Sequence, residues 1–242
     1  YLRPDLFVLF DDVQAPRPST YSWLMHAYQE MQIDAEKGHL HLESGNAVLD
    51  TYLWASETLD YTQTDEFAVP LDEPMNKPVQ WHLSATTQEP ATEAFFLAVL
   101  APAKKGTVRD LRVTPVSAGA GDGVRLQEGS TDALILFRPG PAGELTTDEL
   151  AADAAVAAWT RRVDGTEGLL LVEGTRWQSE SGLALKATVP VSAELSIEKE
   201  SVVGTVEHPA RPGSQPYELT LQLGEGQSVK DVTSSHEVLD WQ

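Results

Sequence analysis

Two histidines and a glutamate stand at alternate positions in the segment GHLHLE, residues 38–43. Alternate side chains of an extended strand share one face, so His39, His41 and Glu43 form a row with spacings of about 7 Å. Imidazole and carboxylate groups are ligand types that zinc and copper accept. The same pattern also fits the solvated face of an edge strand whose leucines are buried, and no supporting partner can be named. We therefore assign no cofactor, and a divalent metal at this row stays an open alternative.

Aromatic residues indicate a second kind of chemistry, the stacking of sugar rings. Residues 46–55 (NAVLDTYLWA) place Tyr52 and Trp54 on one side of an expected strand, and a pyranose presents an apolar C–H face to such rings. The full set of candidates for carbohydrate binding is Tyr52, Trp54, Trp81, His82 and Trp177. The competing interpretation is that these aromatic rings fill the space between two packed sheets.

Catalytic signatures give little support to an enzyme. His26, near the end of a strand-like run, is either an acid, base or ligand in a cleft, or a partly buried histidine that donates to a backbone carbonyl. The sequence has no G-x-S-x-G, H-E-x-x-H or Gly-rich phosphate loop, so an α/β-hydrolase, a metalloprotease and a nucleotide enzyme lack support. The chain has 37 acidic residues, so a two-carboxylate glycoside hydrolase is not excluded, but nothing points to it.

The chain is organised around its first apolar runs. Residues 6–12 and 21–27 are rich in apolar and aromatic residues, and two prolines lie in the corner at residues 16–18. This order predicts strand, corner, strand, and we interpret it as the central hairpin of a sandwich. Apolar residues occupy both faces of the first run, including Phe7 and Leu9 on one face, so both strands are expected in the interior.

Short strand-like runs separated by turn signals follow, and this spacing is typical of an antiparallel sandwich. Strands are expected near residues 79–86, 95–100, 107–116, 132–138, 168–173, 182–189, 193–198, 201–207, 216–223 and 228–232. Turns are expected at residues 121–123, 139–141, 164–165 and 211–213, and a long acidic, Pro-rich excursion at residues 59–78. Residues 147–151 predict a short helical turn, followed by a strand at 153–163. The predicted fold is an all-β antiparallel β-sandwich with little helix, in a single domain spanning residues 1–242.

Five pieces of the first 106 residues carry a family resemblance. They are LRPDLFVLFDD (2–12), WLMHA (23–27), TQTDEF (62–67), QWHL (80–83) and the apolar run at 95–102 that ends in KKG (104–106). In this order they resemble the C-terminal β-sandwich region of heparinase II/III-like polysaccharide lyases. These lyases eliminate across a uronic acid, using a base, a group that neutralises the carboxylate and an acid.

The resemblance implies a sandwich that supports the substrate cleft of an upstream α-helical toroid, with a polysaccharide or oligosaccharide as ligand and a secreted or periplasmic location. The family's H-x-H and H-N-T motifs have no counterpart in this sequence, and neither has the toroid. We therefore carry over no catalytic residue and expect that this chain alone does not turn over substrate. The first residue, Tyr1, falls where the resemblance places the middle of a sheet, so we expect a longer parent protein.

Charge limits the partners. The chain of 242 residues has 17 Lys and Arg against 37 Asp and Glu, a net charge of -20, which argues against nucleic acid or an anionic membrane surface. A local basic patch of Lys104, Lys105, Arg109 and Arg112 could bind an acidic polysaccharide, or could be a solvated strand face. There is no cysteine and no apolar run of membrane-spanning length. A free-standing carbohydrate-binding module and a structural assembly domain remain as alternative functions.

Overall fold

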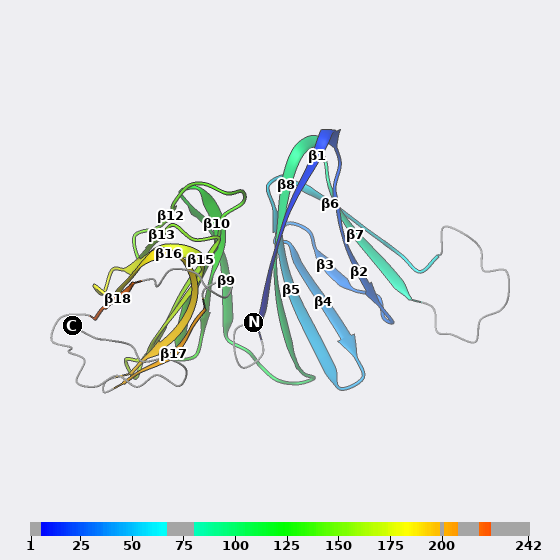
Figure 1. The fold of residues 1–242 in the computed structure, drawn as a ribbon. Coiled ribbons are helices and arrows are strands. Elements are labelled where there is room, and N and C mark those ends of the chain that lie inside the picture. Colours follow the sequence, from blue (N-terminus) through cyan, green and yellow to red (C-terminus); the bar gives the residue numbers. More distant parts are fainter. Residues whose placement is uncertain (1–5, 67–79, 199–200, 208–217, 224–242) are drawn as a thin grey trace.

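The computed structural model describes residues 6–66, 80–198, 201–207 and 218–223. These residues form antiparallel strands joined by turns and loops, without a helix, which confirms the predicted all-β fold class. The strands form three sheets that pack against one another in layers (Figure 1). Among the described residues there is no helix with the length and apolar character needed to cross a bilayer.

The first eight strands build two of the three sheets. The five-stranded sheet has the order β1-β8-β5-β4-β3, and the three-stranded sheet has the order β2-β7-β6. The bounds are β1 (Phe7–Ser19), β2 (Ser22–Ala27), β3 (Gln32–Asp34), β4 (His39–Ser44), β5 (Ala47–Ala55), β6 (Leu59–Thr64), β7 (Trp81–Thr87) and β8 (Ala91–Lys104).

The remaining ten strands form one sheet that curls into a nearly closed barrel (Figure 1). Its main path is β12-β13-β15-β14-β11-β10-β9, and β16 adds to β15 and carries β17 and β18 on its other side. A bridge between Gly119 and Leu145 joins β12 to the turn between β9 and β10. The bounds are β9 (Leu111–Ala118), β10 (Gly121–Glu128), β11 (Thr131–Phe137), β12 (Leu145–Thr146), β13 (Leu150–Ala152), β14 (Val156–Arg162), β15 (Glu167–Ser179), β16 (Ala184–Ile197), β17 (Val202–Glu207) and β18 (Leu219–Gln222).

Three apolar clusters hold these layers together. The outer core lies between the three-stranded and five-stranded sheets and includes Leu40, Leu53 and Leu83. The middle core joins the five-stranded sheet to the ten-stranded sheet, and the barrel core lines the other face of the ten-stranded sheet. β8 therefore buries both faces, with Phe96 in the outer core and Leu97 in the middle core, and its nearly continuous apolar sequence follows from that position.

The predicted central hairpin is wrong. β1 pairs with β8 and β2 pairs with β7, so the two strands belong to different sheets. The expected corner at residues 16–18 is also wrong, because these residues lie inside β1, where the pairing with β8 shifts register between Gln14 and Ser19. β1 is an edge strand, and Phe7 and Leu9 are 43% and 44% exposed. β2 is likewise an edge strand of its sheet, and its Leu24 is 63% exposed. Apolar alternation predicted the strands correctly but not their place at the sheet edges.

The predicted helical turn at residues 147–151 is also wrong. The Thr147 hydroxyl accepts hydrogen bonds from the backbone N–H groups of Glu149 (3.3 Å) and Leu150 (3.1 Å), as a helix N-cap would. The chain nevertheless turns directly into β13, because Leu150 and Ala152 are almost completely buried in the barrel core. Burial of alternate residues here outweighs the helix propensity of the alanines.

Several other boundaries differ from the prediction. Residues 121–123 begin β10 instead of forming a turn, and Gly121 and Gly123 allow the carbonyls of Phe137 and Ile135 to approach closely. Residues 182–189 and 193–198 belong to one long strand, β16, and the first part of the excursion at 59–78 is β6. The rest of that excursion, from residue 67, the turn at 211–213 and the strand at 228–232 lie outside the described residues.

Candidate functional site

The polar side chains of the candidate site lie on a hairpin formed by β4 and β5. Gly45 and Asn46 make a two-residue turn, and Gly45 adopts a φ of 58°, which favours glycine. The turn fixes the register so that His41 faces Asp50 and His39 faces Tyr52 across the two strands. The sequence pattern predicted the His39 and His41 row, but it missed Asp50 as their partner.

Asp50 holds both histidines. Its Oδ1 accepts a hydrogen bond from His39 Nε2 at 2.9 Å and another from His41 Nδ1 at 2.8 Å. An ionised carboxylate can only accept, so both of these ring nitrogens carry protons. The hydrogen bond to Asp50 raises the pKa of His41 above its ordinary value, against the opposing effect of burial. His41 therefore stays protonated to a higher pH than an ordinary histidine does.

Aromatic rings continue the group along β5. The Tyr52 ring stacks on the His39 ring with a distance of 4.9 Å between the ring centroids. The centroid of the Trp54 ring lies 6.4 Å from that of Tyr52. Tyr52 and Trp54 pack against the middle core, and burial raises the pKa of the Tyr52 phenol. These rings thus occupy the space between two sheets, which was the competing interpretation of the sequence.

A small polar cavity adjoins these residues at the end of the middle core. It has a volume of about 140 Å³ and is lined by His39, Val48, Asp50, Tyr52, Ala101, Ala103, Thr107, Arg109 and Leu111. Its floor comes from β4, β5 and β8, and its wall comes from the connection between β8 and β9 and the start of β9. The two alanines leave the space that larger side chains would fill.

Arg109 fixes the wall of the cavity. Its guanidinium makes a two-pronged ion pair with Glu128, with both N···O distances at 2.6 Å, and also donates to the Pro102 carbonyl. The ion pair lowers the pKa of Glu128. Since the Arg109 side chain is only 12% exposed, this pair fastens the connection to the end of β10 in a partly desolvated environment.

The row of His39, His41 and Glu43 does not gather into a ligand set. Both imidazoles direct a nitrogen at Asp50, and Glu43 pairs with Lys105 at 2.5 Å, which lowers the pKa of Glu43. Within the described part of the chain, no group of three or more His, Cys, Asp or Glu side chains could hold a metal ion. The geometry supports a hydrogen-bonded network at this row.

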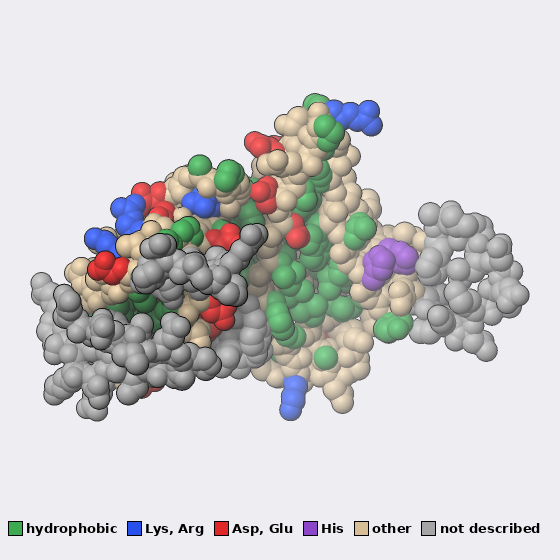
Figure 2. All heavy atoms as spheres, in the orientation of Figure 1, with side chains coloured by type: hydrophobic (Ala, Val, Ile, Leu, Met, Phe, Trp, Pro, Cys, Tyr) green, Lys and Arg blue, Asp and Glu red, His purple; other side chains and the backbone are tan. Residues whose placement is uncertain are grey.

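The remaining carbohydrate candidates lie apart from the cavity. Trp177 is completely buried in the barrel core, so the expectation that it offers a surface for a sugar is wrong. Trp81 and His82 begin β7, where the His82 ring lies 4.6 Å from the His26 ring of β2. Figure 2 shows histidine side chains on the side of the molecule formed by the three-stranded sheet. Apolar side chains gather on the same view over β5 and β8.

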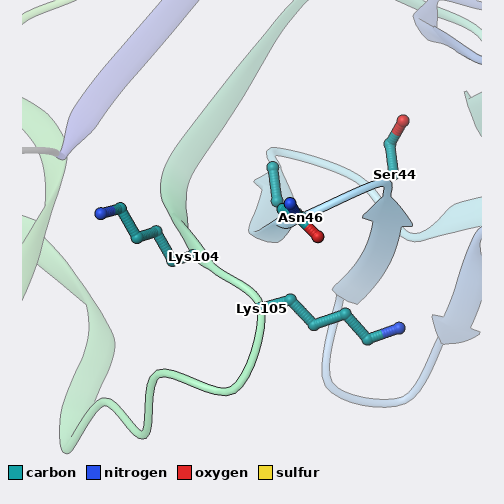
Figure 3. Close-up of a pocket in the computed structure, with 5 residues that line it drawn as sticks. Ser44, Asn46, Lys104 and Lys105 are labelled. Carbon is teal, nitrogen blue, oxygen red and sulfur yellow. The ribbon is translucent and has the colours of Figure 1, made fainter.

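The basic residues do not form one patch. Lys104 and Lys105 line a shallow surface hollow of about 580 Å³ with Ser44, Asn46 and Ala47, and their side chains extend to opposite sides (Figure 3). Lys105 is engaged by Glu43 and Arg109 by Glu128. Arg112 is exposed on β9. The sequence grouped these four residues by proximity along the chain, but Lys104 and Lys105 extend apart and the guanidinium of Arg109 is directed at Glu128.

The site therefore belongs to an all-β protein of layered antiparallel sheets, with a polar cavity where the chain passes from one sheet to the next. No known family model and no curated protein matches this chain.

Proposed function

We propose that this chain is the C-terminal β-sandwich part of a heparinase II/III-like polysaccharide lyase, which supports the substrate cleft of an upstream α-helical toroid. One observation carries the proposal. The described parts of the five sequence pieces that carry the resemblance fall on or beside β1, β2, β6, β7 and β8, which belong to the two sheets packed around the outer core. The resemblance thus extends over one structural unit and is not scattered over unrelated strands.

The role proposed for this chain is support and ligand contact, and the elimination chemistry belongs to the toroid. Elimination needs a base and a free cationic or hydrogen-bonding group that stabilises the developing enolate. Around the cavity of the described structure, the cations Lys105 and Arg109 are engaged by Glu43 and Glu128. His39, Asp50 and Tyr52 are suited instead to hydrogen bonding with a saccharide. A saccharide-degrading role is consistent with a secreted or periplasmic protein.

The test uses the protein isolated from its source. Denaturing intact-mass analysis is expected to find a polypeptide or an associated fragment beyond the 26.4 kDa of this chain. The same sample is expected to release unsaturated uronates, followed by their ultraviolet absorbance, from at least one uronic-acid-containing polysaccharide. The recombinant 242-residue chain is the matched control and should release none. A native protein of 26.4 kDa without elimination activity would contradict the proposal.

A free-standing carbohydrate-binding module is the second candidate, and the polar cavity favours it. The described aromatic residues do not support the surface platform expected from the sequence, since Trp177 is buried and Tyr52 and Trp54 pack against the middle core. Saccharide binding by a native protein that is no longer than this chain would favour the module over the lyase.

A further inference from the structure

The cavity beside Asp50 retains several groups that can still form hydrogen bonds. Because His39 donates through Nε2, its Nδ1 is an acceptor. Within the described structure no hydrogen bond engages this Nδ1, Asp50 Oδ2, the Tyr52 hydroxyl or the Thr107 hydroxyl. The set combines two acceptors with two hydroxyls that can both donate and accept. Such a mixture matches the hydroxyl groups of a ligand, which also donate and accept.

Charge around the cavity favours a neutral ligand. Arg109 is neutralised by Glu128, and the negative charge of Asp50 is shared by two imidazole N–H groups. A carboxylate placed in this space would meet the negative charge of Asp50, and among the described residues that line the cavity the guanidinium of Arg109 is already paired with Glu128. The overall net charge of -20 adds to this repulsion. The cavity is thus poorly suited to the uronic acid carboxylate itself.

Size limits the ligand to part of a sugar. A volume of about 140 Å³ corresponds to about five water molecules at about 30 Å³ each. This is well below the roughly 300 Å³ at which pockets for larger ligands begin. Val48 and Leu111 add apolar surface beside the polar groups, which is the combination that a sugar ring with C–H and O–H groups requires.

We propose that this cavity binds the hydroxyl-bearing edge of one neutral sugar residue, through His39, Asp50, Tyr52 and Thr107. The inference rests on the proposed function in taking a saccharide as the ligand, and it deepens that function by naming an uncharged residue of the polysaccharide as the one recognised. The site would then hold a sugar that neighbours the uronic acid, leaving the acid itself to the toroid.

The experiment is a titration of the full 242-residue chain at pH 7, followed by two-dimensional NMR of backbone amides and histidine rings. The probes are glucose, galactose and mannose, with glucuronate as the charged comparison. We expect saturable shifts at millimolar concentration with at least one neutral sugar, confined to residues around His39 and Asp50, and weaker binding of glucuronate.

Three variants connect the binding to the cavity. Tyr52→Phe and Thr107→Val each remove one hydroxyl and should weaken binding about fivefold, as expected for one lost neutral hydrogen bond. Ala103→Leu should abolish binding by filling the space. The matched control is Tyr61→Phe, the same change at a tyrosine that packs against the outer core, and it should leave the affinity unchanged. If Ala103→Leu does not fold, the two hydroxyl variants still decide the question.

Absence of saturable binding, glucuronate binding as tightly as the neutral sugars, or affinities indifferent to both hydroxyl variants would overturn the inference. None of these outcomes would contradict the lyase proposal, which is tested by the mass and the elimination product of the native protein. Conversely, a native protein without lyase activity leaves sugar binding by this chain to be judged on its own titration. The two failures are therefore distinguishable.

Discussion

Replacing Asp50 with asparagine tests the hydrogen-bonded group at the centre of the site. Asparagine has nearly the same shape, but it is uncharged and offers only one oxygen as an acceptor. In the native protein one carboxylate oxygen accepts from both His39 and His41. In Asp50→Asn the pKa of His41 should therefore fall, because the hydrogen bond to Asp50 is the main cause of its elevation.

The expected loss of stability is moderate. Hydrogen bonds to a charged group contribute about 1.5–3 kcal/mol each when well shielded, but these side chains are 27–31% exposed, which weakens the electrostatic part. The amide oxygen can still accept from both imidazoles, but it is uncharged, so each of the two bonds is weaker. We expect Asp50→Asn to lower the free energy of unfolding by about 1–2 kcal/mol near pH 6.

The pH dependence of this loss has a definite sign. The folded pKa of His41 is raised above its unfolded value of 6.5, so the stabilisation from protonated His41 is fully present below pH 6.5 and is lost as the pH rises through the raised pKa. The deficit of Asp50→Asn should thus be largest between about pH 5 and 6.5 and smaller near pH 9. The part that remains comes from the hydrogen bonds that neutral imidazoles still donate to the carboxylate.

Urea unfolding at pH 5.5, 7 and 9, with an NMR titration of the histidine rings, measures both effects. Asp110→Asn is the control, because Asp110 is exposed and forms no ion pair or side-chain hydrogen bond in the described structure; it should change stability by less than about 0.5 kcal/mol. The reasoning is refuted if the deficit of Asp50→Asn grows as the pH rises, or if the His41 midpoint does not move.

Three further changes test the layers that position the site. Asp153→Ala should cost about 2–4 kcal/mol at pH 7, because its carboxylate accepts from the backbone and hydroxyl of Thr175 and from the backbone of Arg176. Burial raises the pKa of Asp153, but the hydrogen bonds lower it by more, so the pKa of the folded protein lies below its ordinary value. The difference in free energy of unfolding between the native protein and Asp153→Ala, measured by urea unfolding, should therefore be lost on acidification below about pH 4. Leu97→Ala should cost about 2–5 kcal/mol in the same assay, since Leu97 is 1% exposed in the middle core, and equal stability of variant and native protein would count against that core. Gly123→Ala should cost about 1–3 kcal/mol and lower the thermal midpoint, since a Cβ there would lie 2.1 Å from the Ile135 carbonyl oxygen; an unchanged midpoint would contradict the close approach.

The strand pattern was predictable because the alternation of side chains along a strand is a local property. Residues 46–55 were expected as a strand with Tyr52 and Trp54 on one side, and β5 has this arrangement. The partner of each strand is not local. The first part of β1 has the apolar alternation of an interior strand, but among the described strands β1 pairs with β8 alone. Pro16 and Pro18 near its end are the local signal of an edge position, since proline cannot donate a ladder hydrogen bond.

The candidate site was half predictable for the same reason. Spacing alone placed His39 and His41 on one face of a strand, but Asp50 joins them only through the register of the hairpin. That register was present in the sequence. Gly45-Asn46 is a turn dipeptide, and a two-residue turn at this place pairs Ser44 with Ala47. Counting three residues back along one strand and three forward along the other then brings His41 opposite Asp50. Arg109 and Thr107 could not be found this way, since they reach the cavity through a loop.

The position of the cavity follows from the path of the chain between the sheets. β8 belongs to the five-stranded sheet and β9 to the ten-stranded sheet, so residues 105–110 must cross the middle core at its end. A crossing backbone carries polar groups that an apolar core cannot satisfy, and the core accordingly changes along β5 from Trp54 and Tyr52 to Asp50. The Arg109 pair with Glu128 holds the crossing in place. Substitutions in the crossing should consequently alter the shape of the cavity while the packing between the sheets remains.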